Sequence, residues 1–295
     1  MAFRDVKITQ RLNAGEVLVA DGAAGTTLIA AGIPAGTPPE QWNVERPEVI
    51  LALHRSYIEA GSQIILTNTF GGSRLKLAKF SQAEKVREFN LAGARLARQA
   101  AGDRAYVAGD LGPTGMLMKP MGKLTFEEAV ETFAEQAGIL AEAGVDLLWV
   151  ETMMDLEEAR AAVTGAQQAR DLPVFCSLSF GKKGRTMMGI SGKQAAEKLW
   201  PMGLAAIGAN CGEGLEPVEI ALQQMREALP EAPLIAKPNA GLPHMVAGQA
   251  VYDVGPLEFT PHMVDLVALG AQVVGACCGS NPEYIAAIHA AVKES

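Results

Sequence analysis

Eight short apolar runs, rich in β-branched residues, recur along the chain with little polar alternation. They occupy residues 17–20, 64–66, 106–108, 147–150, 174–178, 205–208, 234–236 and 273–276. Uninterrupted apolar runs of this length are typical of parallel strands that are buried on both faces of a sheet. The pattern therefore predicts a parallel sheet of eight strands.

Segments with helical spacing of apolar residues lie between these runs. They cover residues 48–60, 83–101, 126–143, 156–169, 192–200, 217–229, 260–269 and 282–292. Thr125 with Glu128 three residues later predicts a capping box, and Gly144 and Gly270 are helix stop signals. Strands that alternate with helices in this way predict an α/β fold, a (β/α)8 TIM barrel, with an open doubly wound sheet as the rival. No linker divides the chain, so we expect residues 1–295 to form a single domain.

Polar residues lie at the end of each apolar run or shortly after it, at the point where the predicted strand ends. They include Asp21, Asn68, Asp110, Glu151, Ser177, Asn210, Lys237 and Cys277. Active sites of (β/α)8 barrels lie at the carboxyl ends of the strands. We therefore expect these side chains to gather on one rim of the barrel.

Three cysteines stand at two of these strand ends. Cys277 and Cys278 are adjacent and lie between two glycines, and Cys211 ends the sixth run. Three thiolates suit Zn²⁺ and leave its fourth tetrahedral position for a substrate. The alternative is that each cysteine is a small buried apolar residue, and this is the interpretation we favour for Cys176, inside the fifth run.

A three-thiolate zinc site favours one kind of chemistry. Its formal charge is negative, so it activates water poorly but holds a further thiol, which must lose its proton to bind. A free thiol is only about 3 % ionised at pH 7, and complete ionisation is equivalent to about 2 kcal/mol. The sequence therefore predicts alkyl transfer to a thiol.

Two carboxylates are candidates for binding a substrate ammonium group. Asp21 and Glu151 are each the first acidic residue after an apolar run, and two carboxylates on one rim can hold a cation by charge-assisted hydrogen bonds. The alternative is that either caps a helix or pairs with a basic residue of the rim. Asp110, in a glycine-rich stretch, is interpreted more readily as part of a turn.

Composition and charge narrow the class of partner. The chain is 49 % hydrophobic and 20 % charged, and its formal net charge is −8 without a basic block. These values indicate a soluble globular protein with no nucleic-acid and no membrane partner. Four cysteines without a recognisable signal peptide favour a reducing compartment, so we expect a cytoplasmic protein.

Two stretches on the predicted rim are long for loops. Residues 112–123 follow the third run, and residues 239–258 follow the seventh. Loops of more than about 12–15 residues without secondary structure are uncommon and are often functional. We treat residues 239–258 as a candidate lid, with a surface excursion of no function as the alternative.

Seven short motifs resemble the homocysteine S-methyltransferase family over nearly the whole chain. They begin at Asp21 (DGAAGT), Thr67 (TNTFGG), Gly112 (GPTG), Glu151 (ET), Asn210 (NCG), Pro238 (PNAG) and Cys277 (CCG). The family includes the homocysteine-binding domain of cobalamin-dependent methionine synthase and the betaine–homocysteine methyltransferases. The resemblance implies a (β/α)8 barrel that transfers a methyl group to homocysteine to form methionine.

The resemblance also implies roles for individual residues. The zinc ligands correspond to Cys211, Cys277 and Cys278, which are also the catalytic residues. The carboxylates that bind the amino group of homocysteine correspond to Asp21 and Glu151. We add Gly22 and Asn210 as substrate-binding candidates, and Trp42 and Asn68 as candidates on the side of the methyl donor.

The sequence does not decide the identity of the methyl donor. Animal betaine enzymes have tyrosines where this chain has Gly71 and Thr152, yet stand-alone bacterial betaine enzymes resemble it more closely. We expect a small onium compound such as betaine. The alternative donor is a methylated corrinoid (methylcobalamin) on a separate protein, and a remote alternative is a non-catalytic zinc–thiolate or redox-sensing protein. The sequence leaves a homo-oligomer open.

Overall fold

Eight parallel strands form a barrel in the computed structural model, which describes residues 3–246 and 249–294. The strands are β1 (Leu18–Val19), β2 (Ile64–Leu66), β3 (Tyr106–Leu111), β4 (Leu147–Met153), β5 (Val174–Leu178), β6 (Ala206–Cys211), β7 (Leu234–Pro238) and β10 (Ala271–Val274). Their order is β1-β10-β7-β6-β5-β4-β3-β2, and a parallel bridge between Ala20 and Ile64 brings the two end strands together. The predicted (β/α)8 barrel is confirmed, and the open sheet is excluded.

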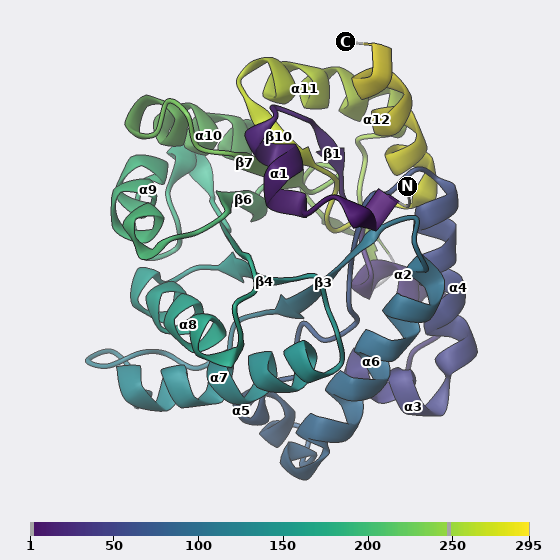
Figure 1. Cartoon of the computed structure of the whole chain (residues 1–295), viewed down its shortest axis with the longest axis vertical. Helices are drawn as coiled ribbons and strands as arrows, with labels where there is room; N and C mark the ends of the chain where they lie inside the picture. The colour runs from purple at the N-terminus through teal and green to yellow at the C-terminus, as the bar shows by residue number, and fades with distance from the viewer. Residues whose placement is uncertain (1–2, 247–248, 295) are drawn as a thin grey trace.

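Helices form a ring around the strands (Figure 1). The ring contains α4 (Pro47–Glu59), α6 (Val86–Ala101), α7 (Phe126–Glu142), α8 (Leu156–Ala169), α9 (Gly192–Leu199), α10 (Leu215–Ala228), α11 (Pro256–Ala268) and α12 (Pro282–Glu294). Shorter helices are α1 (Ile8–Asn13), α2 (Gly25–Ala30), α3 (Trp42–Glu45) and α5 (Arg74–Ala78). The capping box of Thr125 and Glu128 opens α7 as predicted. Helix α11 begins at Pro256, earlier than residue 260, because a proline fits the first turn of a helix.

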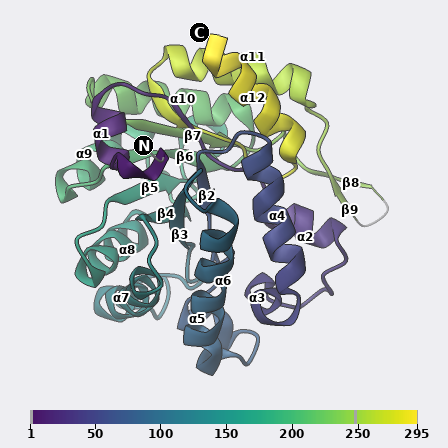
Figure 2. The same ribbon diagram turned by 45° about the vertical axis from the view of Figure 1, so that its right-hand side comes forward.

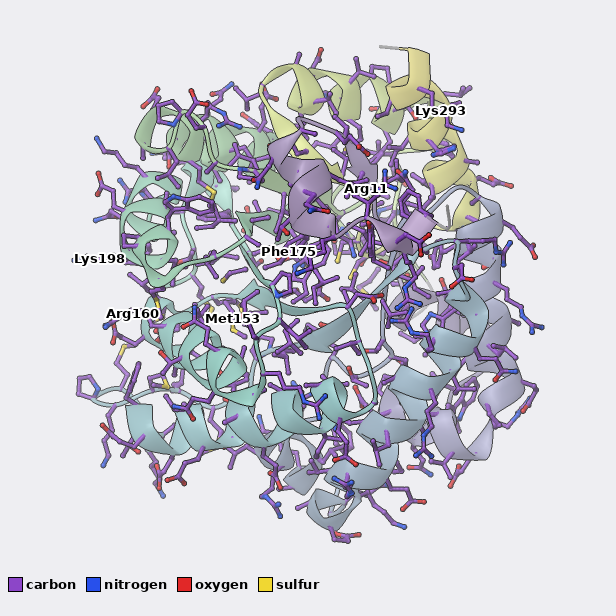
Figure 3. The ribbon with its side chains drawn as sticks, viewed as in Figure 1. Arg11, Met153, Arg160, Phe175, Lys198 and Lys293 are labelled. Carbon is purple, nitrogen blue, oxygen red and sulfur yellow. The ribbon has the colours of Figure 1, made fainter. Side chains whose placement is uncertain are left out.

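The strands are buried on both faces, as their apolar runs predict. One set of side chains fills the barrel interior, where Trp149 and Phe175 meet edge to face with ring centroids 5.4 Å apart. The other set packs between the strands and the helices. Figure 3 shows Phe175 near the middle of the barrel, whereas Arg160 and Lys198 lie on the outside.

Helix α1 closes the amino end of the barrel. Its buried residues Ile8 and Leu12 pack into the same interior cluster as the strand residues Leu18 and Tyr106. Gln272 Nε2 donates a hydrogen bond of 2.6 Å to Leu12 O, which ties the helix to β10. In Figure 1 this helix lies across the strands. The carboxyl ends of the strands are therefore the ends left for a site.

The segment after β7 contains secondary structure, which corrects the expectation of an unstructured loop. Strands β8 (His244–Val246) and β9 (Gln249–Val251) pair in antiparallel fashion, and Figure 2 shows them extending beside α2. Residues 247 and 248 lie outside the described residues. The chain then returns to the barrel, where Val254 N donates to Ala240 O.

Within residues 3–246 and 249–294, no helix has both the length and the apolar character needed to cross a membrane.

Candidate active site

Polar side chains from several strand ends line one cavity of about 250 Å³, which we call the strand-end cavity. The predicted site residues among its walls are Asp21, Gly22, Asn68, Glu151, Cys211, Cys277 and Cys278. Asp110 and Lys237 also line it. The expected gathering of polar residues on one rim is thus present in the structure.

The three cysteines predicted as metal ligands form a compact group at this cavity. The Sγ atoms of Cys211, Cys277 and Cys278 all lie within 4.8 Å of one another. In the described part of the chain this is the one group of three or more His, Cys, Asp or Glu side chains close enough to share an ion. Three sulfurs at this spacing, each partly exposed, fit a soft or borderline ion such as Zn²⁺.

Hydrogen bonds within the group distribute its protons unequally. The thiols of Cys277 and Cys278 hydrogen-bond to Cys211 and lower the pKa of Cys211 to about 3. The same hydrogen bonds to Cys211 raise the pKa of Cys277 well above the ordinary value and that of Cys278 to about 11. One thiolate is therefore shared by two thiols, and a bound cation would displace the two remaining protons.

The backbone at the sixth strand end is bent to present its cysteine. Cys211 has a φ of 59°, in the left-handed region that non-glycine residues rarely adopt. Gly212 follows with a φ of 75°, and a Cβ there would lie 2.1 Å from Phe180 O, so glycine is required. The strained turn directs Cys211 toward Cys277, whose amide donates to Pro238 O at the end of β7.

Cys176 differs from the other three cysteines. It is fully buried within β5, and burial raises its pKa to about 12. A neutral thiol packed in this way acts as a small apolar residue, in agreement with its interpretation as a core residue.

Asp21 has a buried partner that the sequence did not identify. Lys237 Nζ donates to Asp21 Oδ1 at 3.0 Å, and Leu66 N donates to Oδ2 at 2.8 Å. Burial raises the pKa of Asp21, against the effect of Lys237, and Asp21 with Glu151 holds the pKa of Lys237 above its ordinary value despite burial. Because both oxygens of Asp21 accept from N–H donors, we treat the contact as an ion pair.

Asn210 contacts Glu151 from behind the cavity wall and is not itself part of that wall. It is fully buried and does not line the cavity; its Nδ2 donates to Thr152 Oγ1 at 2.6 Å and to Glu151 Oε2 at 3.5 Å. Its Oδ1 accepts from Thr152 N at 2.8 Å and from Ser177 Oγ at 2.7 Å. Burial raises the pKa of Glu151 to about 7, against the lowering effect of Lys237. Glu151 is thus a fixed, partly unsatisfied acceptor.

Asp110 lies inside β3 and not in a turn, which corrects the interpretation favoured from the sequence. It is buried, and its Oδ1 has no hydrogen-bond partner. Burial and the neighbouring Glu151 raise its pKa well above the ordinary value.

The two residues expected on the donor side lie in different surroundings. Asn68 lines the cavity, and its Nδ2 donates to Pro39 O at 2.8 Å. Trp42 packs into the core between strands and helices, with the Arg46 guanidinium 5.4 Å from its ring centroid, and does not line the cavity. Its burial leaves its ring no face toward a donor.

Sequence reasoning missed three other residues at or near the cavity. Glu40 and His54 line it, and Tyr252, which follows β9, hydrogen-bonds to Cys278. Tyr252 follows the short strand β9, which the sequence did not predict. Glu40 lies in the short helix Pro39–Gln41, where no periodic pattern identifies it.

The fold and the site define a (β/α)8 barrel with a three-cysteine group, able to hold a metal ion, beside buried carboxylates. The chain belongs to the homocysteine S-methyltransferase family, whose profile matches residues 18–292. The family consists of enzymes that methylate homocysteine, and the predicted family and enzyme class are confirmed.

Several known proteins are similar to this chain. Methionine synthase of Mycobacterium leprae is 32 % identical over 299 residues, and that of Mycobacterium tuberculosis is 32 % identical over 296. The alignments cover 95 % and 94 % of this chain but 24 % of each synthase, so the chain spans about a quarter of their length.

A solved structure, the homocysteine methyltransferase MmuM from Escherichia coli, shares the fold over its whole length. Its metallated form has a TM-score of 0.80 at 24 % identity and covers 95 % of this chain and 98 % of that chain. Its oxidised form has a TM-score of 0.75 at 25 % identity, covering 93 % and 95 %. These likenesses show that the two proteins share the same barrel fold.

Proposed function

We propose that this chain transfers a methyl group from a small onium donor such as betaine to the sulfur of homocysteine, forming methionine. The observation that carries the proposal is the three-cysteine group, which faces the same cavity as Asp21 and Glu151. We further propose that the group holds Zn²⁺ and that the protein works in the cytoplasm, where a reducing environment keeps its thiols free.

Cys211, Cys277 and Cys278 would hold the ion. When bound, Zn²⁺ would lower the pKa of the homocysteine thiol and keep its sulfur as a nucleophilic thiolate. The protein contributes the spacing of the three sulfurs and the strained backbone at Cys211, which set the direction from which the substrate sulfur approaches the donor.

The amino-acid part of homocysteine fits the carboxylate side of the cavity. Glu151 has an oxygen free for the substrate ammonium, whereas Asp21 already accepts from Lys237 and Leu66 N. We propose Glu151 as the main acceptor, with Asp21 sharing its remaining lone pairs. A Cβ on Gly22 would lie 2.8 Å from Ser280 Oγ and from the Tyr57 ring, so glycine keeps this wall close to the substrate.

The transfer itself needs orientation more than acid or base catalysis. A sulfur–carbon bond forms as the carbon–nitrogen or carbon–sulfur bond of the onium group breaks, and the bonding pair stays on the departing atom. The leaving group is then neutral and needs no proton. A cavity of about 250 Å³ favours a small donor, since ordinary ligand sites span about 300–1,000 Å³.

A second donor has its own support. The two mycobacterial relatives are methionine synthases, of which this chain covers only a quarter, so the chain could receive its methyl group from a methylated corrinoid on another protein. A panel of donors with homocysteine separates the two functions. Methionine from betaine or another onium compound supports the main proposal, and methionine from methylcobalamin alone refutes it in favour of the second.

A further inference from the structure

Glu40 is a buried carboxylate that the fold does not explain. It is 2 % exposed, lines the strand-end cavity, and accepts a hydrogen bond of 2.6 Å from Gly71 N at its Oε1. Burial raises its pKa, which means that the charged form is costly. A glutamine would accept the same hydrogen bond without this cost, so the hydrogen bond gives no reason for a charge.

The position of the Glu40 carboxylate depends on Gly71, which has no side chain to occupy the same space. A Cβ on Gly71 would lie 3.0 Å from Oε1 and 3.3 Å from Oε2, so both oxygens lie over the glycine. The rings of Phe70 and Phe80 and the side chain of Leu53 line the same cavity. The carboxylate therefore lies among apolar and aromatic walls, which suit a weakly hydrated organic cation that the carboxylate can pair with.

Two further polar groups line the cavity with Glu40. His54 is 2 % exposed, and its Nε2 has no hydrogen-bond partner. Buried polar atoms are nearly always satisfied, so an unpaired one facing a cavity indicates a missing ligand. Lys76 also lines the cavity, and its charge favours the ionised form of Glu40. The walls of the cavity thus include an anion, a neutral imidazole and a cation.

We propose that Glu40 recognises the positive charge of the methyl donor, and that the donor is a small zwitterion with its carboxylate toward Lys76. A quaternary ammonium group has no N–H and cannot donate a hydrogen bond, so its charge, felt by Glu40 and by the nearby aromatic rings, is what distinguishes it from a neutral group of equal shape. This inference rests on the proposed onium-dependent methyl transfer and adds the residues that select the donor.

Steady-state kinetics with glycine betaine test the role of Glu40. The variant Glu40→Gln keeps the acceptor for Gly71 N and is expected to fold. We expect its KM for betaine to rise about tenfold or more, because the donor loses one charged partner. The KM for homocysteine and the zinc content should not change. Glu59→Gln, an exposed change at the end of α4, is the matched control and should behave as wild type.

A neutral isostere makes the test specific for charge. 3,3-Dimethylbutyrate has the shape of betaine with carbon in place of nitrogen, and its inhibition constant should be the same in wild type and in Glu40→Gln. Lys76→Met supplies an independent variant. It should raise the KM for betaine but leave the inhibition constant of tetramethylammonium, which has no carboxylate, unchanged.

The outcomes separate this inference from the function on which it rests. An unchanged KM for betaine in Glu40→Gln overturns the inference and leaves onium-dependent transfer standing. Equal losses of affinity for betaine and for 3,3-dimethylbutyrate in Glu40→Gln would show that Glu40 acts through shape alone. That result would also overturn the inference. If wild type forms no methionine from any onium compound, the proposed function fails, and this inference with it.

Discussion

Lys237 Nζ lies 3.0 Å from Asp21 Oδ1, and both side chains are buried at the carboxyl ends of the strands. The contact joins the end of β7 to the residue that follows β1. The cavity therefore contains a cation of its own before any substrate binds. In the proposed binding mode, the substrate ammonium group meets an Asp21 that is already engaged and a Glu151 that is available, so we expect the two carboxylates to differ in role.

Loss of Lys237 should destabilise the fold. Lys237→Met leaves Asp21 buried without its partner, and breaking one side of a buried ion pair typically costs about 3–5 kcal/mol. Urea denaturation should show a fall of this order in the free energy of unfolding. Lys193→Met, which removes an exposed contact of 4.0 Å to Glu197, should have little effect.

The double variant Lys237→Met with Asp21→Asn checks the physical reason. It removes both charges, so most of the lost stability should return. Equal stability of the single and double variants would contradict an ion pair.

Glu151 should control the affinity for homocysteine. Glu151→Gln removes the charge but keeps the shape, and a hydrogen bond to a charged group contributes about 1.5–3 kcal/mol, or roughly 10- to 100-fold in binding. The KM for homocysteine should rise by that factor while the zinc content stays constant. Glu157→Gln, on the exposed side of α8, is the control. An unchanged KM would exclude Glu151 from the ammonium site.

The cysteine group should bind metal as a unit. Cys277→Ala leaves two sulfurs, so we expect loss of zinc and of methionine formation together, as measured by metal analysis and product assay. Cys176→Ala, in the core of β5, should keep both. Removal of zinc with a chelator should abolish activity, and added zinc should restore it. A metal-free wild-type protein with full activity would refute the assignment.

His54 should make the protein sensitive to acid. Burial lowers its pKa from 6.5 to about 4, so between these values the unfolded chain binds a proton that the folded chain does not. Stability should therefore fall as the pH drops from 6.5 to 4, by about 3 kcal/mol from this group.

A comparison with His54→Gln isolates this contribution from those of the carboxylates. With a chelator present, the difference in unfolding free energy between pH 7.5 and 4 should be smaller in the variant by that amount. His262→Gln, an exposed change on α11, should retain the sensitivity of wild type. Identical pH profiles for wild type and His54→Gln would contradict a neutral buried imidazole.

The barrel was predictable because its strands are apolar on both faces and leave a continuous signal in the sequence. The signal ended too early wherever a strand continues into polar residues, as β3 does at Asp110 and β6 at Cys211. The hairpin of β8 and β9 was not predicted, since its strands, His244–Val246 and Gln249–Val251, each begin with a polar residue and form no continuous apolar run.

The candidate site was predictable where the residue type is rare. Two adjacent cysteines are hard to explain by packing, so their residue type alone marked them as candidate metal ligands before their positions were known. The pair of Asp21 and Lys237 spans 216 residues, and no local pattern links two such positions. Glu40 lies in a three-residue helix, where a carboxylate is ordinarily exposed, so its burial required the structure.

The packing of α1 against the amino ends of the strands has a practical consequence. Ile8 and Leu12 fill that end of the barrel, on the side opposite the cysteines. A tether attached ahead of α1 would hold the molecule with the strand-end cavity facing the bulk solution. Surface-based binding measurements are best arranged in that orientation, since small ligands could then diffuse in unobstructed.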